Sequence, residues 1–339
     1  MFKGRAWKAD RFGDPETVLQ IGTDIWEEPP PGSVLVKVAA CGLGLPDKFM
    51  TEGRYPIVAT PPVKPGQEVS GRVVSVPSGS AFRTGERVMG ITLYGDGWWR
   101  GGLADYAFVQ ERKCLRVPDS MTDESAAGFT IGFRTAHAGL IERVPVACGQ
   151  RILVLGAAGS SGAAAICLSK ALGCEIFALA SSEDKRRFCQ SIGADHVFDY
   201  RQEGWVEAVM DATQGHGIDV IFDPVGGSTA KQALATLAPA ARIALIGFAS
   251  GTWLDLDAQD MVLRNYSAIG VFSGGFSAEE ESQAYARLER MARDGEITTP
   301  LGNVFEFEKA GEAICLLETP GPGKTVVRVA EGSPGLFGS

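Results

Sequence analysis

The sequence lacks the signals of several protein classes. Its 339 residues contain no basic tract, and 41 acidic against 32 basic side chains give a net charge of −9. A surface for nucleic acid or for an anionic membrane is therefore disfavoured. No apolar run reaches the roughly 18 residues of a membrane span. The start, Met1 to Lys8, has no apolar stretch of the kind that marks a secretory signal.

Cysteine and histidine are sparse and do not form familiar chemical patterns. The seven cysteines are odd in number and include no C-x-x-C pair, which predicts reduced thiols and a cytoplasmic protein. The three histidines belong to no Ser-His-Asp or H-E-x-x-H arrangement, and no pair of carboxylates suggests acid–base hydrolysis.

What the chain does contain is enough length for two cores, since about 150 residues is a common domain size. The first 120 or so residues alternate as strands with turns, for example at 33–39, 69–76 and 104–109, which predicts an irregular, partly closed β domain. From about residue 125 strands and helices alternate, which predicts a parallel sheet covered on both faces. The expected elements are strands at 151–155, 175–180, 196–198, 218–222 and 242–247, with helices at 160–172 and 183–192. Near the end, a helix at 307–317 and a strand at 325–329 follow.

A glycine loop at 156–162 directly follows an apolar strand and opens a small-residue helix. In this context glycines let the backbone approach a pyrophosphate, whose charge is stabilised by the free N–H groups at the helix start. Ala157 stands where the usual fingerprint has its first glycine, so the loop is a variant. The pattern predicts dinucleotide binding, and a tight turn without a ligand is the alternative.

Cofactor choice is expected at the end of the second strand, about 20 residues further on. A carboxylate there would favour NADH, but Ser181 and Ser182 stand there instead and Lys185 follows. Hydroxyls followed by cations favour a 2′-phosphate and therefore NADPH. Ser182 can also act as the N-cap of the next helix, which does not prevent Ser181 and Lys185 from binding phosphate.

Seven segments in order resemble the medium-chain dehydrogenase/reductases, and among these the zinc-independent, zeta-crystallin-like quinone oxidoreductases. The segments are 45–47, 65–71, 101–107, 156–162, 193–200, 222–227 and 323–324. The resemblance implies an α/β protein with a GroES-like β domain, built from 1–124 and 298–339, and a Rossmann doubly wound parallel-sheet domain at 125–297. It also places the active site in the cleft between the two domains.

The resemblance further implies that both metal sites of zinc-dependent relatives are absent. Those relatives hold zinc with a Cys where this chain has Gly44 and a His where it has Gln67. Neither residue is a credible zinc ligand, and the cysteines of a structural zinc lobe are missing from 90–110. The expected activity is hydride transfer from NADPH to an acceptor that absorbs charge itself. A quinone is the favoured acceptor, and an enone, an alkenal or an enoyl-thioester such as 2-enoyl-CoA is the alternative. A different class of function, a non-catalytic NADPH-binding protein, also remains open.

The site residues also come from the resemblance. Ser181, Lys185 and Tyr200 would surround the 2′-phosphate and adenine. The residues expected under the pyrophosphate are Ala158, Gly159, Ser160, Ser161 and Gly162, and those expected along the nicotinamide are Thr135, Phe248, Val271 and Ser273. Structural roles in strand ends, turns and the core are open alternatives for Tyr200, Thr135 and Val271.

Three residues are candidates for the substrate cleft, and none is assigned as a dedicated proton donor. Asp47 and Tyr55 match positions that border the family's cleft, although Asp47 can equally be a hydrogen-bonded loop carboxylate. His137 can donate a proton, and a packed helix histidine is the favoured alternative. The loop 95–100, with Trp98 and Trp99, either lines a pocket or forms an exposed hairpin. The resemblance also implies a homodimer that pairs strands near 267–272.

Overall fold

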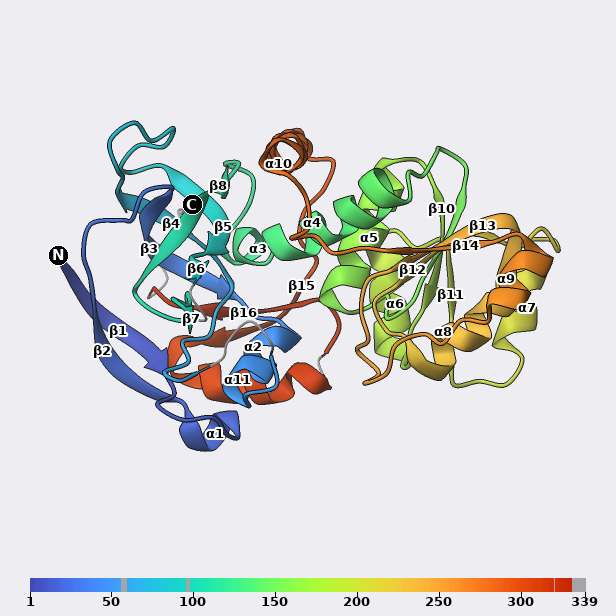
Figure 1. Cartoon of the computed structure of the whole chain (residues 1–339), viewed down its shortest axis with the longest axis horizontal. Coiled ribbons are helices and arrows are strands. Elements are labelled where there is room, and N and C mark those ends of the chain that lie inside the picture. The colour runs from blue at the N-terminus through green and yellow to red at the C-terminus, as the bar shows by residue number, and fades with distance from the viewer. Residues whose placement is uncertain (56–59, 96–97, 320, 331–339) are drawn as a thin grey trace, which may run out of the picture. The chain divides into compact units, whose positions relative to one another are not determined.

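The computed structural model describes residues 1–55, 60–95, 98–319 and 321–330. The chain divides into two compact units (Figure 1). Unit 1 comprises Met1–Ile131, Ser277–Pro320 and Lys324–Ser339, and unit 2 comprises Gly132–Phe276 and Gly321–Gly323. One unit is therefore assembled from both ends of the chain, as the resemblance implies.

The division differs from the expected boundaries of 125 and 297. Helix α10 (Ala278–Arg293) belongs to unit 1, because its buried Glu281 carboxylate pairs with the Lys113 ammonium at 3.3 Å. Its Glu289 also accepts a 2.8 Å hydrogen bond from the backbone N–H of Arg116. A single helix between two domains offers no pattern in the sequence that says which domain it covers.

Unit 1 is built on a mixed sheet of order β15-β16-β3-β4-β5-β8. Strand β3 also pairs with β8, so that β3, β4, β5 and β8 close on themselves. The strands are β3 (Ser33–Gly42), β4 (Glu68–Ser75), β5 (Arg87–Thr92), β8 (Tyr106–Arg116), β15 (Leu301–Glu306) and β16 (Lys324–Arg328). The predicted partly closed β domain is confirmed.

Smaller elements surround this sheet. The hairpin of β1 (Phe2–Lys8) and β2 (Gln20–Trp26) pairs residue for residue from Phe2 with Trp26 to Lys8 with Gln20. The remaining elements are α1 (Pro15–Val18), α2 (Leu45–Thr51), β6 (Tyr94–Gly95), β7 (Trp98–Trp99), α3 (Asp123–Ala127) and α11 (Ala310–Cys315). The expected single helix at 307–317 is α11 flanked by two 3₁₀ turns, at Phe307–Lys309 and Leu316–Glu318.

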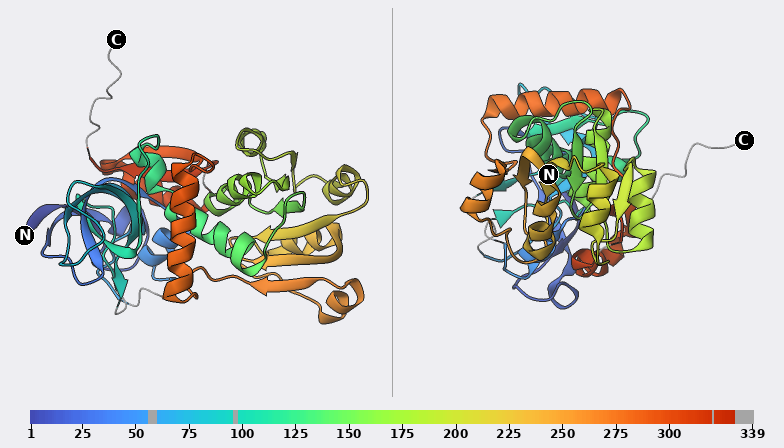
Figure 2. Two further views of the ribbon diagram at one scale, coloured as in Figure 1. Left: turned by 90° about the horizontal axis from the view of Figure 1, so that it is seen from above. Right: turned by 90° about the vertical axis from the view of Figure 1, so that its right-hand side faces the viewer.

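Unit 2 contains a parallel sheet of order β11-β10-β9-β12-β13-β14, with helices on both faces (Figure 2). Its strands are β9 (Arg151–Val154), β10 (Glu175–Leu179), β11 (His196–Phe198), β12 (Ile218–Asp223), β13 (Leu237–Leu245) and β14 (Ser267–Gly270). Its helices are α4 (Thr130–His137), α5 (Ser160–Ala171), α6 (Glu183–Ser191), α7 (Trp205–Ala212), α8 (Gly227–Ala233) and α9 (Ala258–Arg264), and α4 begins in unit 1. In chain order the strands run 3-2-1-4-5-6, which is the doubly wound arrangement of dinucleotide-binding domains.

Each unit has its own core. In unit 1 it includes residues from both chain ends, such as Trp7, Phe307 and Val327, and the Trp7 indole N–H donates a 2.8 Å hydrogen bond to the Phe307 carbonyl. In unit 2 the apolar strands β9, β10 and β12 supply the centre, with Leu153, Phe177 and Ile221 buried. Along the described residues no helix is long and apolar enough to span a membrane.

Candidate functional site

The glycine loop of unit 2 packs closely against the first turn of α5. It runs from the end of β9 to the N-cap of α5, which is Gly159. A Cβ on Gly162 would lie 2.4 Å from the Gly156 carbonyl oxygen and 2.8 Å from the Ala157 Cα. Gly156 itself has φ +56°, in the left-handed region. The loop is thus folded back onto the first turn of α5, and only glycine fits at position 162.

This loop lies at the point where the strand order reverses. Strand β9 pairs with β10 on one side and with β12 on the other, and dinucleotides bind outside the carboxyl ends of the strands at such a point. A Cβ on Gly156 would lie 2.8 Å from the Val225 side chain, so the loops after β9 and β12 touch. The Asp223 carboxylate orders the second loop, because it accepts hydrogen bonds from the backbone N–H groups of Val225 (2.9 Å) and Gly226 (2.8 Å). Burial raises the pKa of Asp223.

The predicted 2′-phosphate residues follow two neighbouring strands. Ser181 and Lys185 come after β10, and Tyr200 comes after β11, which pairs with β10 in parallel. Ser182 caps α6 as expected, since its hydroxyl accepts from the Lys185 N–H at 3.3 Å. The carboxyl ends of these strands meet at one edge of the sheet, so the structure brings the three residues to that edge.

The cations of α6 differ in their partners. The Arg186 guanidinium donates to Asp199 (2.7 Å) and Glu183 (2.8 Å), and Arg187 pairs with Asp184. Burial raises the pKa of Asp199, but hydrogen bonds from Arg201 and Arg186 outweigh it and lower the pKa overall. Within the described chain, the half-buried Lys185 ammonium has no ion pair. Lys185 is therefore the cation that remains available to a phosphate.

The residues expected along the nicotinamide divide between two places. Phe248 follows β13, and Val271 follows β14, which pairs with β13. The backbone N–H of Val271 donates a 3.0 Å hydrogen bond to the Leu245 carbonyl. Ser273 stands two residues beyond Val271. Thr135 is half-buried on α4, away in sequence from this edge, and no described contact joins it to the other three.

Asp47 of unit 1 is fully buried and lies in the first turn of α2 rather than in a loop. One of its oxygens accepts from the Gly44 N–H at 2.9 Å and the other from the Gly66 N–H at 2.7 Å. Burial raises its pKa to about 6, against the lowering effect of these two hydrogen bonds. The carboxylate thus joins the loop before α2 to the loop before β4, which is the hydrogen-bonded alternative considered for it.

Those two loops contain the positions of the zinc ligands in zinc-dependent relatives. Gly44 offers no side chain, and the Gln67 amide is not a ligand type that zinc takes. Among the described residues, no group of three or more His, Cys, Asp and Glu side chains is arranged to hold a metal ion. The donor set does not fit a catalytic zinc.

Tyr55 lies beside the same pair of loops. Its hydroxyl hydrogen-bonds with the Gln67 side chain, and burial raises the pKa of the phenol, with a smaller contribution from the Asp47 charge. Tyr55 is half-buried. Of the three cleft candidates, Tyr55 is the one that is not fully buried.

His137 lies at the end of α4 and is 4% exposed. Its Nδ1 is 3.7 Å from a Glu142 carboxylate oxygen, which also accepts a 2.6 Å hydrogen bond from the Arg134 guanidinium. A π-helical turn at Ala138–Arg143 returns Glu142 toward both residues. This is the geometry of the packed helix histidine.

Sequence reasoning missed a buried ion pair next to Asp47. The Lys324 ammonium of β16 is 2.5 Å from a Glu68 carboxylate oxygen at the start of β4, and both side chains are at most 3% exposed. The other Glu68 oxygen accepts from the Ile131 N–H at 2.9 Å. Lys324 was noted only as part of a family motif, and no local pattern links two residues so distant in the sequence.

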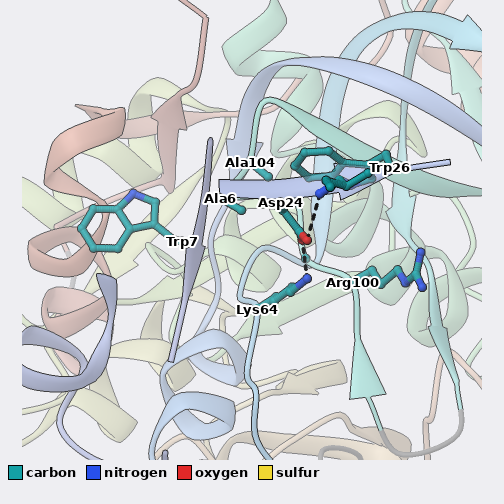
Figure 3. A pocket seen from close by; sticks show the side chains of 9 residues that line it. Ala6, Trp7, Asp24, Trp26, Lys64, Arg100 and Ala104 are labelled. Atoms are coloured by element: carbon teal, nitrogen blue, oxygen red, sulfur yellow. Dashed lines mark hydrogen bonds and ion pairs between the residues drawn. The ribbon is translucent and has the colours of Figure 1, made fainter. Parts of the chain in front are cut away.

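A small cavity of about 90 Å³ lies elsewhere in unit 1 (Figure 3). Asp24, Trp26, Lys64 and Arg100 line it, and Lys64 is ion-paired with Asp24. The volume suffices for a few water molecules. Arg100, the last residue of the predicted 95–100 loop, is in the lining, but none of the predicted cofactor or substrate residues is. Strands β6 and β7 of the predicted 95–100 loop pair with each other. Residues 96–97 and the indole side chains of Trp98 and Trp99 lie outside the described part of the chain, so the prediction that these indoles line a pocket is not tested.

Comparison with known proteins agrees with this geometry. The alcohol dehydrogenase GroES-like domain family matches residues 30–119, and the zinc-binding dehydrogenase family matches residues 162–290. A quinone oxidoreductase-like protein 2 homolog of Nematostella vectensis is 31% identical over 305 residues, covering 88% of this chain and 82% of the relative. The chain belongs to the quinone oxidoreductase-like medium-chain dehydrogenase/reductases.

Two solved structures extend the likeness of this quinone oxidoreductase-like chain. A probable oxidoreductase from Mycobacterium abscessus superposes with a TM-score of 0.85 at 30% identity, covering 97% of this chain and 99% of the other. A mycobacterial protein solved in complex with NADPH gives a TM-score of 0.84 at 27% identity, covering 96% and 100%. The expected family and fold are confirmed, and the chain is an oxidoreductase of this type.

Proposed function

We propose that the protein transfers hydride from NADPH to a quinone without a metal ion. The single observation that carries the cofactor assignment is the Lys185 ammonium. It is available in the first turn of α6, which follows β10. Ser181 stands where an NADH enzyme would place a carboxylate. The NADPH-bound mycobacterial neighbour supports the same cofactor.

The proposed contacts cover each part of this cofactor. The backbone from Ala158 to Gly162 would hold the pyrophosphate, with the free N–H groups of the first turn of α5 donating to it. Ser181, Lys185 and Tyr200 would hold the adenosine end. Thr135, Phe248, Val271 and Ser273 are retained as the proposed nicotinamide contacts. When bound, the nicotinamide supplies the hydride, and the protein contributes orientation and exclusion of water.

The nature of the acceptor follows from the residues in the zinc-ligand positions. Because Gly44 and Gln67 do not fit a metal, this chain offers no Lewis acid there to stabilise an alkoxide. The acceptor must delocalise negative charge over its own atoms, as a quinone does. Of the cleft candidates, Tyr55 is the proposed neighbour of the acceptor, Asp47 holds the loops, and His137 packs in α4.

Cofactor choice is tested with Lys185→Ala, and Arg187→Ala is the matched control on the same helix. Loss of one charge-assisted contact is expected to raise the Kd for NADPH about tenfold and to leave that for NADH unchanged. Arg187 is already paired with Asp184, so its variant should bind NADPH as the wild type does. Wild-type protein that binds NADH more tightly than NADPH would overturn the assignment.

Acceptor class is tested by steady-state oxidation of NADPH with 1,4-benzoquinone, 9,10-phenanthrenequinone, an alkenal and crotonyl-CoA. The quinones are expected to give the highest kcat/KM. Dominant turnover of the alkenal or the thioester would identify an enone or enoyl-thioester reductase on the same scaffold. NADPH binding with no oxidation by any acceptor would point to the non-catalytic rival.

We also propose a homodimer formed through β14, which lies at an edge of the unit 2 sheet. Helix α9 before it presents Val262 and Leu263, which are 73% and 72% exposed. An edge strand beside exposed apolar side chains favours pairing with a second copy. Sedimentation should give a mass of twice 35.9 kDa, and a monomer at micromolar concentration would contradict the dimer.

A cytoplasmic location stays a prediction, supported by the seven free thiols.

A further inference from the structure

Two aromatic side chains stand together on the surface of unit 2. The Phe248 and Trp253 rings lie 4.7 Å apart, centroid to centroid, with their planes tilted by 36°. They remain 43% and 57% exposed. Gly251, between them, has φ +94°, which allows the tight turn that brings the rings into contact.

The loop that carries these rings is held firmly. The backbone N–H of Ala249 donates to the Pro224 carbonyl at 3.1 Å, and that of Ser250 donates to the Val225 carbonyl at 3.0 Å. Immediately after Trp253, Leu254 is 9% exposed and belongs to the unit 2 core. The pair is therefore fixed on both sides, and its exposure is a property of the folded loop rather than of a free chain end.

The position of the pair indicates what it contacts. It follows β13 at the carboxyl edge of the sheet, and its loop is bonded to the loop after β12. A dinucleotide bound to such a sheet lies across the point where the strand order reverses. One half lies over β9, β10 and β11, and the other half lies over β12, β13 and β14. Ser181 and Lys185 are on the adenosine side. Phe248 and Trp253 are thus on the side of the reacting ring, where the acceptor must also lie.

We propose that Phe248 and Trp253 form an aromatic platform that stacks against the planar ring of the acceptor and so selects for large flat acceptors. The inference rests on the proposed quinone reduction. Offset or tilted ring contacts stabilise a complex beyond the area that they bury. Exposed paired rings on a fixed loop are typical of a ligand-contacting surface. The platform favours an uncharged polycyclic quinone over a one-ring quinone, and both over an acyclic alkenal.

The kinetic test compares Trp253→Ala with the conservative Trp253→Phe, because Phe248 is itself a proposed nicotinamide contact. Trp253→Ala is expected to raise the KM for 9,10-phenanthrenequinone about tenfold, to raise that for 1,4-benzoquinone less, and to leave kcat and the Kd for NADPH unchanged. Trp253→Phe should retain most of the affinity. Ile21→Ala, an exposed apolar side chain of β2, is the control and should leave every constant unchanged.

A binding test separates failure of this inference from failure of the proposed reaction. Calorimetric titration of 9,10-phenanthrenequinone into protein saturated with NADP⁺ allows no turnover, so it reports the platform even if an enoyl thioester proves to be the substrate. Equal quinone affinity in wild type and Trp253→Ala would overturn the platform. So would a matching loss of NADPH affinity in Trp253→Ala, which would place the Trp253 ring on the cofactor, or a change in sedimentation, which would place it in an interface.

Discussion

The buried pair of Lys324 and Glu68 gives the most specific prediction for stability. Lys324→Met removes the ammonium but leaves the Glu68 carboxylate in the core of unit 1, with only the Ile131 N–H to accept from. Breaking a buried pair in this way costs about 3 to 5 kcal/mol. Unit 1 comprises a little under 200 residues. An unfolding entropy of about 2.1 cal/mol/K per residue then converts that cost into a decrease in Tm of about 8 to 12 °C.

Calorimetry of the wild type, Lys324→Met and the double variant Glu68→Gln/Lys324→Met provides the assay. The double variant removes both charges, while the amide oxygen introduced at position 68 can still accept from the Ile131 N–H. We therefore expect it to recover most of the lost stability. Lys309→Met, which breaks an exposed pair with Glu312, is the control and should have no measurable effect.

The same variants differ in pH dependence. In Lys324→Met the buried Glu68 carboxylate has lost its counter-charge, and protonation would remove this unpaired charge from the core. The destabilisation should therefore shrink as pH falls. The double variant should lack this component. A cost below about 1 kcal/mol, or a double variant as unstable as the single one, would refute the reasoning.

Three further predictions follow from the geometry. Gly162→Val places side-chain carbon against the Gly156 carbonyl and the Ala157 Cα. We expect weaker binding in an NADPH titration, and a decrease of about 1 to 3 kcal/mol in the free energy of unfolding, measured by thermal unfolding. Unchanged NADPH binding would contradict the proposed role of the loop. In Gly311→Ala of α11 the added methyl group would make only ordinary contacts beyond 3.8 Å. The variant should raise the free energy of unfolding by about 0.5 to 1 kcal/mol in a denaturant titration, and a decrease would refute this prediction. Asp47, with a pKa of about 6 against an ordinary 3.8, adds stability that is fully present below pH 3.8 and lost as pH rises through 6. Asp47→Asn should remove this dependence, worth about 3 kcal/mol, and an unaltered pH profile of unfolding would contradict it.

The sequence predicted best what is decided locally. Strand β11 was expected at 196–198 and is found there, and helix α5 ends one residue before its expected end at 172. Both are fixed by apolar periodicity and by turn residues. Strand β13 begins at Leu237 rather than at 242. Its first part contains Pro239 and passes through Ala240 with φ +59°, so its sequence lacks the pattern of a regular strand.

The parts that could not be predicted depend on residues far apart in the chain. The pairing of β1 with β2, the assignment of α10 to unit 1 and the ion pair of Lys324 all depend on tertiary contacts. Of the candidate site, the glycine loop and the capping role of Ser182 could be derived from neighbouring residues. The partners of Asp47 could not, since Gly66 is brought to it only by the fold.

The discontinuous construction of unit 1 has a consequence for synthesis on the ribosome. Strand β3 emerges early, but its partner β16 is translated only after the whole of unit 2. At about 5 to 20 residues per second, Lys324 follows Glu68 by about 13 to 50 s. During that interval the end of β3, from Ala40 to Gly42, lacks its partner strand, and the Glu68 carboxylate lacks its cation, while unit 2 can already fold. Unit 1 can therefore be completed only after β16 has been translated, and loss of β16 would leave the N-terminal segment unable to finish its sheet.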